Sequence, residues 1–217
     1  MSSDLPWRLV TVDIDGTLTI GHGWRPIAEA FGGVPAFEES NRRFFAGDIG
    51  EDAHLTNLLR ITTGRTVAEV ETVLCATPKL VGIPEGIAGL HRRGVRVDLL
   101  THNPDYVADW YRRSFGFDEF AAVSAQPVVD GRIGAPVGVR ADKPGALRSL
   151  LAHERLPASS VVHVGDGRSD AALFSIVGAG IALNSPYADV RNAADLAVTT
   201  NDFRDVVKGI LQLRPRR

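Results

Sequence analysis

Two aspartates separated by one residue, Asp13 and Asp15, end the short β-branched run V-T-V and are followed at once by Gly16. Side chains at positions i and i+2 leave a strand on the same face, and the glycine allows a sharp turn beside them. Two acids that converge at a strand end suit a nucleophile with an acid–base partner, or two ligands of a hard cation. A plain strand-ending turn uses the same residue types, so other segments must decide between these alternatives.

Polar residues also follow the apolar run 95–100, where Thr101, His102 and Asn103 precede Pro104. In open α/β sheets a ligand binds beyond the carboxyl ends of the strands, so these side chains are candidates for ligand contact. Asn103 before a proline is typical of a helix N-cap, which favours a structural role. Thr101 is not expected to cap a helix, and its hydroxyl can donate to a phosphate oxygen. His102 either contacts the substrate or covers the strand end.

Lys143 stands immediately before Pro144, which we expect to be the first residue of a helix. The lysine would then be the N-cap, where it can accept no backbone hydrogen bond and faces the positive end of the helix dipole. A cation at that position needs a compensating anion. The alternative is a solvated surface lysine.

A further acidic strand end lies at residues 161–170, where V-V-H-V runs into Gly-Asp-Gly around Asp166 and Asp170 follows about one helical turn later. The flanking glycines allow a close backbone approach and leave the Asp166 carboxylate in the crevice. His163, inside the apolar run, is expected to be a hydrogen-bonded core histidine.

Convergence of Asp13, Asp15, Asp166 and Asp170 would place four carboxylates together, which repel one another unless cations are present. A divalent cation together with Lys143 relieves that repulsion. Oxygen ligands with room for water favour Mg²⁺ over zinc or copper. A carboxylate nucleophile, a second carboxylate, a hard metal and phosphate donors together suit phosphoryl transfer, where positioning and charge neutralisation provide most of the catalysis.

Strand and helix patterns alternate along most of the chain, which predicts an α/β fold with a parallel sheet and helices on both faces. Residues 20–80 differ, because they hold helical patterns with no convincing strand between them. Residues 126–139 contain V-V-D-G-R-I, an Asp-Gly hairpin signal. Strands are expected at 9–13, 95–100, 161–164, 180–183 and 196–198, and helices outside the 20–80 segment at 85–93, 104–115, 144–154, 169–177 and 202–213.

These motifs, taken in order, resemble those of the haloacid dehalogenase superfamily: D-I-D-G-T-L-T from Asp13, the strand-ending Thr101, the lysine Lys143, and G-D-G-R-S-D at 165–170. The second aspartate of the first motif, Asp15, is typical of that superfamily's phosphatase branch, which this chain therefore resembles. The resemblance implies a Rossmann-like, doubly wound core formed by residues 1–19 and 81–217. It also implies that residues 20–80 form an inserted helical cap of the C1 type.

The resemblance further implies a role for each matched residue. Asp13 would attack phosphorus to form an aspartyl-phosphate, and Asp15 would protonate the leaving alkoxide and then deprotonate water. The phosphate would be bound by Thr101, His102 and Lys143. Mg²⁺ would be held by Asp13, Asp15 through its backbone carbonyl, and Asp166, with Asp170 and Asn103 in supporting positions.

Within the superfamily, the spacing and cap type are most similar to phosphoserine phosphatases, but the substrate-reading positions depart from them. Where those enzymes carry a glutamate after the first motif, this chain has His22; where they carry an arginine in the cap, it has Thr56, with Arg60 one turn further on. His22 and Arg60 are therefore the candidates for substrate specificity, although helical arginines are more often surface residues.

The 217 residues are 44% hydrophobic and 23% charged with a net charge of −2, which is typical of a globular protein with no general attraction to nucleic acid or membranes. The single cysteine, Cys75, excludes an intramolecular disulfide and is expected to be buried. With no signal peptide or membrane span recognised, a cytoplasmic location is expected. We therefore expect a phosphatase for a small phosphomonoester, monomeric or homodimeric, with a phosphotransferase or a non-catalytic binding module as alternatives.

Overall fold

A seven-stranded sheet forms the centre of the protein, whose computed structural model describes residues 5–216. The strand order is β6-β3-β2-β1-β7-β8-β9, and every neighbouring pair is parallel except the antiparallel pair of β3 and β6. The strands are β1 (Leu9–Val12), β2 (Arg96–Pro104), β3 (Phe120–Ala125), β6 (Gly138–Val139), β7 (Val161–Gly165), β8 (Ala179–Leu183) and β9 (Leu196–Val198).

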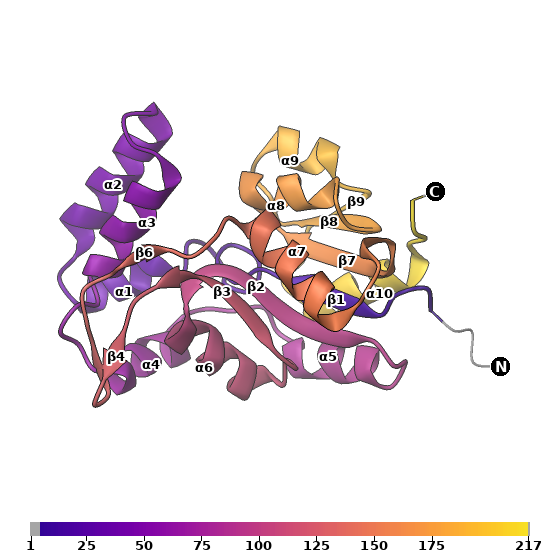
Figure 1. Ribbon diagram of the computed structural model, residues 1–217, viewed down its shortest axis with the longest axis horizontal. Coiled ribbons are helices and arrows are strands. Elements are labelled where there is room, and N and C mark those ends of the chain that lie inside the picture. Colours follow the sequence, from indigo (N-terminus) through magenta and orange to yellow (C-terminus); the bar gives the residue numbers. More distant parts are fainter. Residues whose placement is uncertain (1–4, 217) are drawn as a thin grey trace.

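Helices cover both faces of this sheet, with α5 and α6 along its lower side in Figure 1 and α8 and α9 at its upper side. Successive residues of β1 point to opposite faces, so Val10 packs in the cluster that includes α5, α6 and α10, whereas Leu9 packs with α7. The helices are α5 (Ile83–His91), α6 (Asp105–Phe115), α7 (Lys143–Glu154), α8 (Arg168–Phe174), α9 (Ala188–Ala193) and α10 (Phe203–Gln212). The predicted doubly wound α/β fold is confirmed.

Four helices lie between β1 and α5, where the sequence predicted a helical insert: α1 (Trp24–Ala30), α2 (Val34–Ala46), α3 (Glu51–Arg60) and α4 (Val67–Ala76). Helices α2 and α3 pack as a pair, α3 also contacts the edge strand β6, and α4 packs against α6 (Figure 1). The chain enters and leaves the insert side by side, because Ile20 N–H donates to the Pro78 carbonyl at 2.9 Å and Leu80 N–H to the Leu18 carbonyl at 3.0 Å.

The expected Asp-Gly hairpin is present as β4 (Val128–Val129) and β5 (Arg132–Ile133). Asp130 and Gly131 both have positive φ, 50° and 74°, which is the backbone of a type I′ turn. The hairpin also bonds to the insert: Gly64 N–H donates to the Ile133 carbonyl at 2.7 Å, and Ile133 N–H donates to the Arg65 carbonyl at 2.8 Å. The hairpin is therefore part of the structure around the insert.

Some local predictions were wrong or incomplete. Strand β2 continues four residues beyond the predicted end, through Thr101, to Pro104, and the two strands at one edge of the sheet, β3 and β6, were not predicted. Cys75 is exposed, because the apolar face of α4 is formed by Val70 and Leu74 instead. Within residues 5–216 no helix is both long and apolar enough to cross a membrane.

Candidate active site

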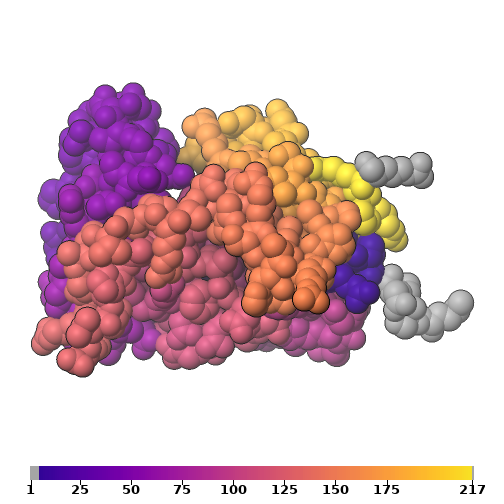
Figure 2. Space-filling model, viewed as in Figure 1, coloured from indigo at the N-terminus to yellow at the C-terminus, as the bar shows by residue number. Residues whose placement is uncertain are grey.

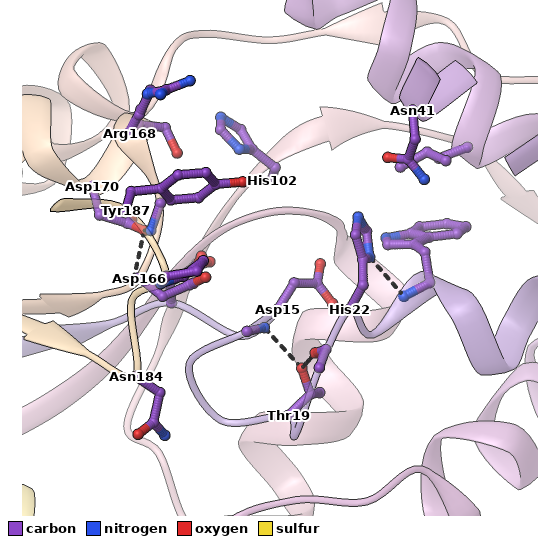
Figure 3. Close-up of a pocket in the computed structure, with 18 of the residues that line it drawn as sticks. Asp15, Thr19, His22, Asn41, His102, Asp166, Arg168, Asp170, Asn184 and Tyr187 are labelled. Carbon is purple, nitrogen blue, oxygen red and sulfur yellow. Dashed lines mark hydrogen bonds between the residues drawn. The ribbon is translucent and has the colours of Figure 1, made fainter. Parts of the chain in front are cut away.

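The carboxyl ends of β1, β2 and β7 meet below a cavity of about 610 Å³. Asp13 directly follows β1, and its N–H donates to the Val164 carbonyl of β7 at 2.9 Å, which places it at the centre of the sheet. Residues of α2 and α3 line one side of the cavity, and Arg168 and Tyr187 line the side that faces them (Figure 3). Figure 2 shows the hollow between the lobe of α2 and α3 and the part of the chain that contains α8 and α9. The cavity thus lies between the insert and the strand ends, where a doubly wound fold binds its ligands.

Lys143 joins two buried carboxylates at the base of the cavity. Its side chain is 0% exposed, and its Nζ lies 2.9 Å from Asp13 Oδ2 and 2.7 Å from Asp170 Oδ1. The expectation that Lys143 is the N-cap was wrong: Asp142 caps the helix by accepting a hydrogen bond from Gly145 N–H, and Lys143 is the first helical residue. The compensating anions that a lysine there requires are Asp13 and Asp170.

Asp170 accepts hydrogen bonds from four donors and is fully buried. These are Lys143 Nζ, His163 Nε2 at 3.0 Å, and the backbone N–H groups of Asp166 and Gly167 at 3.1 and 2.9 Å. Burial alone would raise the pKa of Asp170, but the charge of Lys143 and the bond from His163 outweigh it and hold that pKa well below its ordinary range. Asp170 therefore stays ionised and fixes the position of Lys143.

His163 is the buried, hydrogen-bonded core histidine that the sequence predicted. Its Nδ1 lies 2.8 Å from Thr11 Oγ1, and its Nε2 faces Asp170. A Thr11 hydroxyl that donates to Nδ1 leaves Nε2 as the N–H donor, so His163 helps to orient the Asp170 carboxylate.

Asn103 contacts Asp15 instead of capping a helix. Its Nδ2 donates to Asp15 Oδ2 at 2.8 Å and to Thr101 Oγ1 at 3.0 Å, and its Oδ1 accepts from Trp24 Nε1 at 3.0 Å. The predicted cap was wrong because β2 runs on to Pro104, which directs the Asn103 side chain toward the end of β1. Asn103 thereby sets the orientation of Asp15.

Thr101 and His102 differ in what they offer. The Thr101 hydroxyl is fully buried and accepts from the N–H and Nδ2 of Asn103, which leaves its own hydrogen to donate. His102 lines the cavity, with Nε2 at 3.9 Å from Glu51 Oε1. Burial, reinforced by the charge of Lys143, lowers the pKa of His102 to about 3, so the imidazole is neutral at pH 7.

Asp166 is held by a residue that the sequence analysis missed. Thr17 Oγ1 donates to Asp166 Oδ1 at 2.9 Å, and Thr17 follows directly after Asp15 and Gly16, so its place in the first motif was the available signal. Gly16 has a φ of +73°, and a Cβ there would lie 2.3 Å from Asp166 Oδ2. Only glycine therefore lets this loop approach the Asp166 carboxylate.

The carboxylates at the site carry more negative charge than the protein neutralises. Asp13, Asp166 and Asp170 each offer an oxygen within 4.8 Å of the others. Burial raises the pKa of Asp13 and of Asp15 to about 6, and burial together with the charge of Asp13 raises that of Asp166 to about 8. Because the donors of Asp170 already engage its oxygens, Asp13 and Asp166 are the carboxylates best placed for a hard divalent cation, which fits this all-oxygen set.

The two specificity candidates lie in different places. His22 lines the cavity, accepts a hydrogen bond from Trp24 N–H at 3.3 Å and packs edge-on against Phe37 at 5.1 Å (Figure 3). Arg60 lines a separate hollow on the insert and donates to Asn57 Oδ1 at 3.2 Å, so its expected place in the site was wrong. It lies at the last turn of α3, beyond the cavity-facing residues of that helix.

Aromatic and apolar residues of the insert were also missed, because a helical pattern alone does not tell which face meets a ligand. These cavity-lining residues are Phe44 and Phe45 of α2 and His54, Leu55 and Leu58 of α3.

Known phosphatases are similar to this chain over most of its length. It is 28% identical to a phosphoserine phosphatase of Streptomyces coelicolor over 208 residues, or 94% of this chain. It is 24% identical to a phosphoserine phosphatase of Archaeoglobus fulgidus over 200 residues, or 90% of this chain. The chain spans 50% and 58% of the length of these two relatives.

Solved structures share the fold. A haloacid dehalogenase family hydrolase from Salmonella enterica superposes with a TM-score of 0.84 at 17% identity, over 95% of this chain and 72% of that one. A substrate-bound phosphoserine phosphatase superposes with a TM-score of 0.78 at 21% identity, over 94% and 98% of the two chains.

The family match covers both the first aspartate motif and the glycine-flanked Asp166 motif, because residues 7–178 fit the profile described as "Hydrolase: haloacid dehalogenase-like hydrolase". That span includes the buried Lys143 and the strand ends that surround Asp13. The chain belongs to the haloacid dehalogenase-like hydrolase family.

Proposed function

We propose that this protein is an Mg²⁺-dependent phosphatase that hydrolyses a small-molecule phosphomonoester through an aspartyl-phosphate on Asp13. The observation that carries the proposal is the contact between the Asp13 carboxylate and the fully buried Lys143, at the base of a cavity that Asp15 and Asp166 also line. The likeness to curated phosphoserine phosphatases supports the same reaction class.

In the first step, a carboxylate oxygen of Asp13 forms a bond to phosphorus while the bond from phosphorus to the leaving oxygen breaks. Asp15 gives its proton to that oxygen, and the product alcohol departs. Burial raises the pKa of Asp15 to about 6, which suits proton transfer near neutral pH. Asn103 donates to Asp15 Oδ2 and so fixes the orientation of the carboxyl group that transfers the proton.

In the second step, Asp15 takes a proton from water, and the water oxygen attacks phosphorus to release inorganic phosphate and regenerate Asp13. Lys143 and the Thr101 hydroxyl would stabilise the phosphoryl oxygens, with neutral His102 beside them. Asp170 would keep Lys143 in place throughout. Such preorganised donors provide much of the catalysis in phosphoryl transfer.

Asp13, Asp166 and the backbone carbonyl of Asp15 would hold Mg²⁺. When bound, the cation neutralises charge on the phosphoryl group and on the carboxylates. The raised pKa values of Asp13 and Asp166, which burial causes first, support this, because a bound cation would favour the ionised carboxylates that burial disfavours.

Residues 20–80 would act as a cap over the site, and the hairpin β4–β5 would belong with them. Helices α2 and α3 line the cavity above Asp13, which is only 7% exposed, so access to its carboxylate is restricted. A restricted cavity favours small phosphomonoesters over phosphates carried on folded proteins.

Phosphate release from a broad panel of phosphomonoesters is expected to require Mg²⁺. Purified protein treated with EDTA should release no phosphate, and added Mg²⁺ should restore turnover. A malachite-green assay of phosphate measures this directly. Turnover that persists in EDTA would contradict a metal-dependent reaction, and absence of turnover throughout the panel with Mg²⁺ bound would contradict the phosphatase assignment.

Binding of Mg²⁺ at pH 7 is expected to release about one proton, because Asp166 with a pKa of about 8 is mostly protonated without metal and must ionise to bind it. Proton release should decrease above pH 8, where Asp166 is already ionised. Isothermal titration calorimetry in buffers of different ionisation enthalpy measures the proton count without any substrate. Asp166→Asn should remove both the proton release and most of the affinity; proton-neutral binding by the wild type at pH 7 would contradict the site.

A further inference from the structure

The insert presents an apolar and aromatic surface to the space above Asp15. We define the leaving-group wall as Phe44 and Phe45 of α2 together with His54, Leu55 and Leu58 of α3, all of which line the cavity. An alcohol leaving from phosphorus must lie on the side of Asp15, because Asp15 protonates it in the proposed reaction. The chemistry of the wall therefore selects the leaving group.

The aromatic rings of the leaving-group wall pack against one another. Phe44 stacks on His54 with centroids 4.6 Å apart and planes 8° from parallel, and Ser40 Oγ lies 2.9 Å from His54 Nδ1, which fixes the imidazole. Phe45 lies 5.6 Å from Phe44 and is 63% exposed although it is fully apolar. An exposed phenylalanine beside a stacked pair offers a planar group new aromatic contacts and removes apolar surface from water.

The insert offers no cation to this space. Among the described residues that line the cavity, none from the insert is a lysine or an arginine, and Glu51 is its only charged member. Within residues 5–216, the one arginine that lines the cavity is Arg168, which lies on the side opposite the insert, beside Tyr187, and pairs with Asp189 at 2.9 Å (Figure 3).

The histidines of the cavity do not replace that missing cation. Burial, assisted by nearby His22, lowers the pKa of His54 to about 4, and that of His102 lies at about 3 for the reasons given above. Desolvation by surrounding protein also lowers the pKa of His22, although its side chain reaches solvent. All three are neutral at pH 7, so a carboxylate on the leaving group would find no positive partner here and would face Glu51.

We propose that the preferred substrates are phosphomonoesters of apolar, ring-bearing alcohols that carry no carboxylate, rather than phospho-amino acids. This inference rests on the proposed phosphatase activity and identifies its substrate class. The cavity of about 610 Å³ has the size of sites that enclose organic molecules much larger than serine.

Two matched pairs of substrates separate the ring from the carboxylate. Phenylethyl phosphate and ethyl phosphate share a primary alkyl leaving oxygen and differ in the ring, whereas O-phosphoserine and O-phosphoethanolamine differ in the carboxylate. We expect kcat/KM to be at least about tenfold higher for phenylethyl than for ethyl phosphate, the size of effect that burial of one ring produces. We expect O-phosphoserine to be at least about fivefold poorer than O-phosphoethanolamine, since its carboxylate is unpaired.

Variants of the wall should change these ratios. Phe45→Ala should reduce the ratio of phenylethyl to ethyl phosphate to about threefold or less, because the lost ring contacts act on only one of the two substrates. Leu55→Arg, which brings a guanidinium to the wall, should raise the ratio of O-phosphoserine to O-phosphoethanolamine by at least about tenfold. Val129→Ala, an exposed apolar residue of the hairpin outside the cavity, is the control and should leave both ratios unchanged.

The outcomes distinguish this inference from the phosphatase assignment. Turnover of all four esters with no preference for the ring, or with O-phosphoserine as the best substrate, would overturn the inference and leave the phosphatase activity standing. No turnover of any ester, including a reactive nitrophenyl phosphate, would overturn the phosphatase assignment first and this inference with it.

Discussion

Asp13→Asn is expected to abolish phosphate release, with kcat lowered by at least about four orders of magnitude, as for removal of a nucleophile in other covalent mechanisms. An amide oxygen is a poor nucleophile toward phosphorus, and it carries no charge to bind a cation. The fold should survive, because Lys143 keeps its second partner, Asp170, at 2.7 Å. Steady-state phosphate release together with a thermal melt tests both statements.

A trapping experiment distinguishes a nucleophile from a residue that only binds metal. Acid quench of the wild type during turnover should leave a phosphoryl group on the peptide that contains Asp13, detectable by mass spectrometry, and the variant should show none. Asp109→Asn, at an ion-paired surface aspartate of α6, is the matched control and should keep full activity. Trapped phosphate on another residue, or appreciable turnover by freshly prepared Asp13→Asn, would exclude the mechanism.

Lys143→Met is expected to cost both activity and stability. The substitution leaves Asp13 and Asp170 buried without their shared cation, and breaking a buried ion pair costs about 3–5 kcal/mol. Because Lys143 opposes the effect of burial on the pKa of Asp13, its loss should raise that pKa above 6 and protonate the nucleophile at neutral pH. We expect kcat/KM to fall by at least about a thousandfold.

Two controls isolate the buried charge. Lys208→Met removes an exposed lysine of α10 that pairs with Asp205, and it should change the free energy of unfolding by less than about 1 kcal/mol. Adding Asp170→Asn to Lys143→Met removes one of the stranded charges and should recover part of the lost stability without restoring activity. Urea unfolding measures all three; a Lys143→Met protein as stable as the wild type would contradict the described ion pair.

The central strands could be predicted from the sequence because their signals are local. A β-branched run that ends in Asp13 and another that ends at Gly165 each indicate a buried strand without reference to the rest of the chain. Strand β3 has no such signal, because its sequence F-A-A-V-S-A is mostly small residues, and the edge strand β6 is only two residues long. Their pairing is a tertiary effect that periodicity does not record.

The acids and Lys143 could be placed at one site for a similar reason, since parallel strands deliver their ends to the same edge. The hydrogen-bond partners of those residues could not be predicted in this way. Asn103 was predicted to cap a helix because Asn before Pro often does so. Its contact with Asp15 depends on the pairing of β2 with β1, which the local sequence does not reveal. The orientation of α3 likewise decides that Leu55 faces the cavity while Arg60 does not.

The hairpin that bonds to the insert has a consequence for the modularity of this protein. Residues far apart in the chain, Gly64 and Arg65 on one side and Ile133 on the other, share backbone hydrogen bonds, and Gln126 Nε2 also donates to the Leu59 carbonyl at 3.0 Å. A recombinant chimera that exchanged residues 20–80 alone would leave those donors and acceptors facing a foreign backbone. The transplantable unit is two separate stretches of chain, so insertion or replacement of this lobe during evolution would have required coordinated change at both.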